Sequence, residues 1–99
     1  MVGIPTTALA AAAEPDPVFA LIAAKRAADV AHLDSRHVLN EAERRYGVGS
    51  EEANDAFERG GPACHAAFDA ANSLASTPPT TLVGVLAVLR FVSEIEDQG

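Results

Sequence analysis

The feature that most constrains this chain is a run of thirty residues, 17–46, with no glycine and no proline after its first position. Asp16 precedes the run and can cap free backbone N–H groups, while proline at the first helical position sacrifices no hydrogen bond. Gly47 and Gly49 follow it and can adopt the left-handed conformation that ends a helix. We therefore predict a single helix over 17–46, ~45 Å long at 1.5 Å per residue.

A second helix is predicted over 51–76. Ser50 is a suitable N-cap, and the acidic residues that follow it favour the positive end of the helix dipole. Gly60-Gly61-Pro62 lies in the middle, where such residues kink or break a helix. We expect a kinked or interrupted helix that keeps one buried face, because six residues on both sides of this point share a helical phase: Ala53, Phe57, Cys64, Phe68, Ala71 and Ala75.

The short connection between these helices predicts an antiparallel hairpin. Small residues recur at spacings of three and four along the first helix and predict a narrow seam that a neighbouring helix can approach closely. The members of this expected seam are Ala20, Ala24, Ala27, Ala31, Ser35, Val38, Ala42 and Tyr46. The hairpin would also bring Arg44 and Arg45 near Glu52 and Asp55, so that the two helices complement each other in charge.

A third helix is predicted over 81–96, after a Ser-Thr-Pro-Pro-Thr-Thr segment that ends the second. It is the most apolar part of the chain, and its apolar residues lie on two sides, so one partner helix would cover only part of it. Either this helix supports oligomerisation, or it lies in the groove of the hairpin. The candidate interaction residues are Leu82, Val83, Leu86, Ala87, Phe91 and Ile95.

Length and composition bound the remaining possibilities. A chain of 99 residues fits one domain, and we predict a single all-α, three-helix domain over 16–97 after a flexible N-terminal tail over 1–15. The single cysteine, Cys64, excludes an internal disulfide, so a cytoplasmic location is expected. The longest strongly apolar run, 82–89, is too short to cross a membrane.

The charge balance opposes nucleic-acid binding. Fourteen acidic residues against seven Lys and Arg give a net charge of −7, which repels phosphate. The alternative is a DNA-linked regulator in which dimerisation gathers four arginines of the first helix into a basic strip: Arg26, Arg36, Arg44 and Arg45.

No pattern predicts catalysis, a metal or a cofactor. The pairs Asp29/His32 and Asp34/His37 have a spacing that could hold a metal, but they point about 140° apart around one helix. Cys64 and His65 are adjacent, and neighbours on a helix do not face each other. We therefore read Cys64 as a core residue. A metal-dependent or thiol enzyme, using His37 or Cys64, is the least favoured hypothesis.

Two blocks of sequence carry a resemblance. The opening Asp-Pro-Val-Phe-Ala-Leu-Ile at 16–22 and the segment Thr-Pro-Pro-Thr-Thr-Leu-Val-Gly at 77–84, which leads into an apolar helix, are similar to a family of small uncharacterised bacterial all-helical proteins. The resemblance implies the three-helix layout and brings no activity. The leading hypothesis is thus a non-enzymatic interaction protein, an adaptor or regulator, that forms a homodimer through the third helix and the seam of the first.

Overall fold

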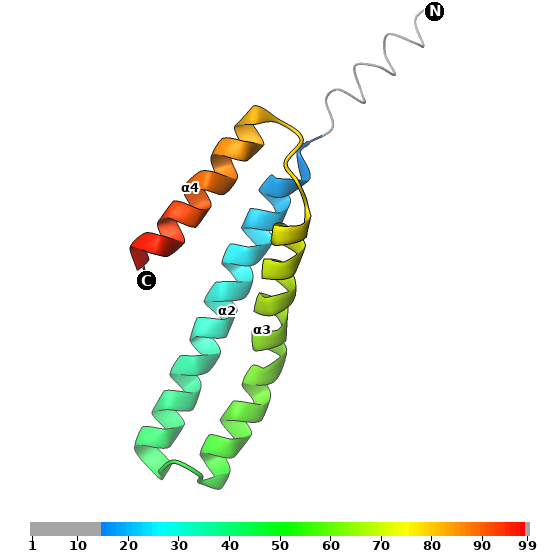
Figure 1. The fold of residues 1–99 in the computed structure, drawn as a ribbon. Helices are drawn as coiled ribbons and strands as arrows, with labels where there is room; N and C mark the ends of the chain where they lie inside the picture. The colour runs from blue at the N-terminus through cyan, green and yellow to red at the C-terminus, as the bar shows by residue number, and fades with distance from the viewer. Residues whose placement is uncertain (1–14, 99) are drawn as a thin grey trace, which may run out of the picture.

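The computed structural model describes residues 15–98 and confirms the predicted all-α architecture. Its helices are α2 (Pro17–Tyr46), α3 (Glu51–Ser76) and α4 (Leu82–Gln98), and α2 and α3 form a long antiparallel hairpin (Figure 1). The N-terminal tail expected over 1–15 lies outside the described residues except for its last position. Within the described residues, no helix is both long enough and apolar enough to span a membrane.

Local chemistry sets the turn of the hairpin where the sequence predicts it. Gly47 (φ 97°) and Gly49 (φ 82°) both have the positive φ that favours glycine. The Gly47 N–H donates to the Glu43 carbonyl at 2.9 Å and ends α2. The Ser50 side chain accepts a hydrogen bond from the Ala53 N–H at 3.1 Å and caps α3.

The two helices of the hairpin meet along a seam of mostly small side chains. On each helix, the buried and half-buried residues recur at alternating spacings of three and four, as in antiparallel coiled coils. The α3 side of the seam is Ala53, Ala56, Gly60, Ala63, Ala67, Ala70 and Leu74. The α2 side is Val18, Leu21, Lys25, Ala28, His32, Ser35, Leu39 and Ala42. Because α3 contributes almost only Gly and Ala, the two backbones can approach closely.

The predicted seam is right at Ser35 and Ala42 of α2 and at Ala53 of α3, and wrong at most of its other members. On α2, the expected alanines of the N-terminal half, together with Val38, face solvent, and the seam lies one residue further along. On α3, Phe57 and Phe68 are 69% and 67% exposed, and Cys64 is only half-buried. A seam of alanines has no room for aromatic rings, so the larger side chains lie beside it.

Helix α3 runs without interruption through Gly60-Gly61-Pro62, so an interrupted helix is excluded. Pro62 cannot donate to the carbonyl four residues earlier, and its ring crowds the residue before it. Gly61 reduces that crowding because it has no Cβ. Gly60 lies close to α2, since a Cβ there would be 3.3 Å from both Cβ and Oγ of Ser35.

Helix α4 packs against α2 and makes no contact with α3 within the described residues. The alternative prediction, in which the third helix lies in the groove of the hairpin, is therefore wrong. Helix α4 runs parallel to the N-terminal half of α2, on the side opposite α3 (Figure 1). Phe91 is the buried anchor at 5% exposure, and the Arg26 guanidinium carbon lies 5.3 Å from its ring centroid. Arg26 also forms an ion pair with Glu94 at 2.7 Å.

Replacing Pro62 with alanine is expected to stabilise the protein. The change restores one backbone hydrogen bond in the interior of α3, where proline is about 3 kcal/mol less favourable than alanine. Urea denaturation followed by circular dichroism measures the effect. Pro17→Ala is the matched control and should change stability by less than ~0.5 kcal/mol, since proline is well tolerated at the first helical position. Equal effects from both substitutions would contradict this account.

Candidate functional site

A single buried carboxylate, that of Asp16, joins the starts of α2 and α4. Its Oδ1 accepts from the Val18 N–H at 3.1 Å and caps α2. Its Oδ2 accepts from the Thr80 N–H and the Thr81 N–H, both at 2.9 Å, and from the Thr81 hydroxyl at 2.8 Å. One side chain therefore receives four hydrogen bonds from two segments far apart in sequence.

Gly84 completes this arrangement, which we call the Asp16 junction (Asp16, Thr80, Thr81 and Gly84). The Gly84 N–H donates to the Thr81 hydroxyl at 2.9 Å, so Thr81 caps α4. A Cβ on Gly84 would lie 2.0 Å from the Asp16 Oδ2, which shows that only glycine fits here. The two sequence blocks that carry the resemblance therefore meet at one point. Sequence reasoning assigned Asp16 to α2 alone.

The environment of Asp16 favours its ionised form. Burial by itself raises the pKa of this carboxyl, but the hydrogen bonds from the Thr81 hydroxyl and from the backbone N–H groups of Val18, Thr80 and Thr81 outweigh it and lower the pKa below its ordinary value. Two parallel helices also bring their positive N-terminal ends together here, and a carboxylate between them offsets that charge.

With α4 held in this way, its other side is exposed. We call this side the α4 outer face, and its apolar side chains are 38–74% exposed: Leu82, Val83, Val85, Leu86, Leu89 and Val92. Three of the predicted interaction residues, Leu82, Val83 and Leu86, belong to it. Phe91 instead packs on α2 and Ala87 is half-buried, while Ile95, 46% exposed, lies at the edge beside Leu33.

A hollow of about 440 Å³ lies on the hairpin, and we call it the α2–α3 groove. Its apolar lining comes from Leu39, Ala56, Phe57, Gly60, Gly61 and Cys64. Its polar lining comes from His32, Ser35, Arg36 and His65. A second hollow, of about 240 Å³, shares His32 and Cys64 with the first and extends to Phe68. The prediction of Cys64 as a core residue is therefore wrong, because Cys64 is only half-buried and lines both hollows.

One of the two histidines of this groove, His32, has an unusual environment. His32 Nδ1 is buried and has no hydrogen-bond partner among residues 15–98. Buried polar atoms in native proteins are nearly always hydrogen-bonded, so such an atom requires an explanation. The sequence placed His32 in a possible metal pair with Asp29, but the ion-pair partner of Asp29 is Lys25.

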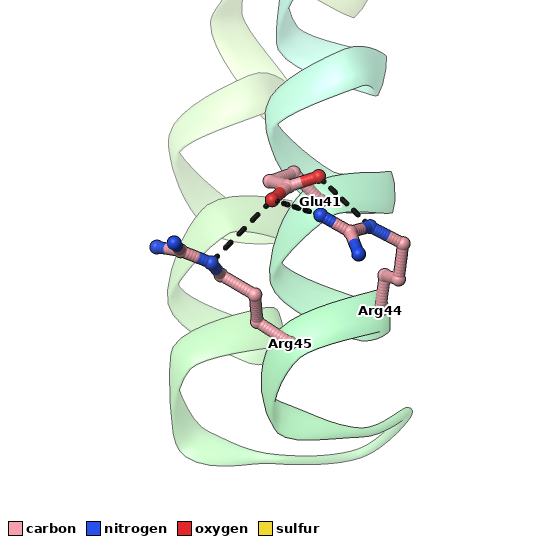
Figure 2. Close-up of polar contacts among 3 residues, drawn as sticks. All are labelled: Glu41, Arg44 and Arg45. Carbon is pink, nitrogen blue, oxygen red and sulfur yellow. Dashed lines mark hydrogen bonds and ion pairs between the residues drawn. The ribbon is translucent and has the colours of Figure 1, made fainter.

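The basic residues of α2 are largely paired with carboxylates of the same chain. Figure 2 shows Glu41 between Arg44 and Arg45, with Arg44 Nη2 at 2.6 Å and Arg45 Nε at 3.5 Å from Glu41 Oε1. The Arg44 hydrogen bond lowers the pKa of Glu41. The expected pairing with α3 does not form among the described residues, where Asp55 pairs with Arg59 of its own helix at 2.8 Å.

Comparisons with family models, with curated proteins and with solved structures give no match for this chain. Among residues 15–98, no three side chains of His, Cys, Asp or Glu lie together in a way that could hold a metal ion. The candidate sites are thus the α4 outer face and the α2–α3 groove.

The Gly84→Ala substitution is expected to destabilise the protein by about 1–3 kcal/mol, because the new methyl group overlaps the Asp16 carboxylate. Thermal denaturation measures the loss. Val38→Ala is the control, because Val38 is 59% exposed on the part of α2 beyond α4 and should change stability by less than ~0.5 kcal/mol. Equal losses in the two variants would show that the contact with Asp16 has no energetic importance.

The Asp16 junction also predicts a pH dependence of stability. Because the folded pKa of Asp16 is lowered, its contribution is complete above the ordinary aspartate pKa of about 3.9 and disappears as the pH falls through the lowered folded value. The stability difference between the wild type and Asp16→Asn should therefore shrink as the pH falls from about 7 to about 3. Urea denaturation across this pH range measures the difference in the free energy of unfolding. Asp69→Asn is the control, because Asp69 is exposed. A difference independent of pH would contradict this role.

Proposed function

We propose that this protein is a non-enzymatic, cytoplasmic interaction module that self-associates through the α4 outer face. The observation that carries the proposal is the one-sided packing of α4, which contacts the hairpin only through α2. Its opposite side is a continuous apolar strip on a helix, and exposed apolar patches of this kind mark interaction sites.

A second copy of the same chain is the occupant we propose for this face. The six residues that define this face are apolar, and the exposed Arg90 and Glu96 on the same side of α4 can keep their charged ends in water through their flexible side chains. The Asp16 junction and Phe91 already fix α4 in position. Association would therefore require little ordering of the backbone, which is one of the main costs of binding.

A DNA-linked regulator is less well supported. The proposed basic strip needs four arginines of α2, but Arg26 pairs with Glu94, and Arg44 and Arg45 both pair with Glu41. Their charge is thus largely compensated within the chain, and the chain as a whole is acidic.

Light scattering coupled to size-exclusion chromatography tests the proposal. The wild type is expected to be a dimer, and Leu86→Asp and Leu89→Asp are expected to be monomers, because each places a charge in the apolar strip. Val38→Asp is the control, since Val38 is similarly exposed, at 59%, on the part of α2 beyond α4. A wild type that remains monomeric at high concentration would overturn the proposal, as would a dimer that all three variants retain.

A further inference from the structure

The middle of α3 breaks the local rules of helix formation. Gly60, Gly61 and Pro62 are the residue types least favourable inside a helix, and they stand together near the centre of α3. Packing against α2 explains Gly60, where a Cβ would crowd Ser35. Gly61 relieves crowding by the Pro62 ring, but packing against α2 does not require it, because a Cβ there would meet nothing within 4 Å beyond the neighbouring backbone. Departures from local preference concentrate at functional sites.

The open space at Gly61 belongs to the α2–α3 groove. Gly61 lies on α3 between Phe57 and Cys64, and all three residues line the hollow. Without a side chain at this position, that part of the groove stays open. Its volume of about 440 Å³ falls within the range typical of small-molecule sites.

The charge of the groove contrasts with that of the protein. Its ionisable lining residues are Arg36, His32, His65 and Cys64, and no carboxylate of residues 15–98 lines it, although acidic residues outnumber Lys and Arg two to one in the chain. His32 Nδ1 is buried and has no partner among residues 15–98, so a ligand in the groove would meet the exposed part of the imidazole. An apolar lining with a few polar groups on one side is the usual composition of a ligand site.

We propose that the α2–α3 groove binds a small amphiphile that combines a hydrocarbon chain with a carboxylate. The hydrocarbon chain lies over Gly61, between Phe57 and Cys64. The carboxylate is held by Arg36 and by the imidazoles that line the groove, since charge-assisted hydrogen bonds are the strongest that these groups form. This site is separate from the α4 outer face, so it does not depend on self-association.

Nuclear magnetic resonance titration of the full chain with decanoate, below its critical micelle concentration, tests the proposal. Saturable shifts are expected at the backbone amides of Gly60, Gly61 and Cys64 and at the imidazole resonances of His32 and His65, which line the groove. Decyltrimethylammonium has the same hydrocarbon chain and the opposite charge, and it should bind at least about tenfold more weakly, the loss expected when one charge-assisted hydrogen bond is absent.

Charge reversal provides the second arm of the experiment. Arg36→Glu should weaken decanoate binding about tenfold or more, because a like charge replaces a favourable partner. Arg90→Glu introduces the same change in net charge at an exposed arginine of α4 and should leave the affinity unchanged. Both side chains are exposed, so neither variant removes a buried contact.

Three results would overturn the proposal. Equal affinity for decanoate and decyltrimethylammonium would remove the recognition of a carboxylate. Shifts confined to the α4 outer face would place the amphiphile on the wrong surface. The third result is a titration in which decanoate gives no shifts, whereas a helical peptide gives shifts along the whole strip from Phe57 to Phe68. This result would assign the groove to a protein partner instead.

Discussion

The arrangement of the three helices depends on the hydrogen bonds of one carboxylate. Asp16 caps α2 and, at the same time, holds the segment that starts α4, so the third helix is parallel to the first. Without this contact, the connection after α3 could direct α4 to many positions on the hairpin. The contact admits only glycine at position 84, and it decides which side of α4 faces α2 and which side faces solvent.

The packing of the hairpin follows a different physical rule. Its seam is narrow because α3 contributes alanine and glycine at almost every inward position, and large side chains are displaced to the flanks. This explains why a small protein with few aromatic residues exposes Phe57 and Phe68. It also explains the α2–α3 groove, which lies where Gly61 leaves the flank without a side chain. Both candidate surfaces are thus consequences of how the helices pack.

The helices themselves could be predicted from the sequence, because caps, glycines and prolines act locally. Ser50 and Gly47 set the turn as expected. The register of the seam could not be predicted, because neighbouring faces of an alanine-rich helix differ little in hydrophobicity. On α3, the phenylalanines favoured the wrong face. The contact between Asp16 and Thr81 joins residues 65 positions apart, and no periodicity reveals it. Both Leu86 and Phe91 could be predicted as interaction residues because they are apolar residues of the third helix. The sequence did not show that Leu86 is exposed while Phe91 is buried against α2.

The alanine seam has a consequence for how such a chain can vary. A larger apolar residue in place of a smaller one strains any close-packed core, and here Ala53, Ala56 and Ala67 are the buried positions of α3 and lie against a neighbouring helix. A valine at any of them would have to fit between two closely packed backbones, at a typical cost of about 1–3 kcal/mol. Phe57 and Phe68, which face solvent, can change without altering the spacing. The smallest side chains, not the largest, therefore set the limits on sequence divergence in this fold.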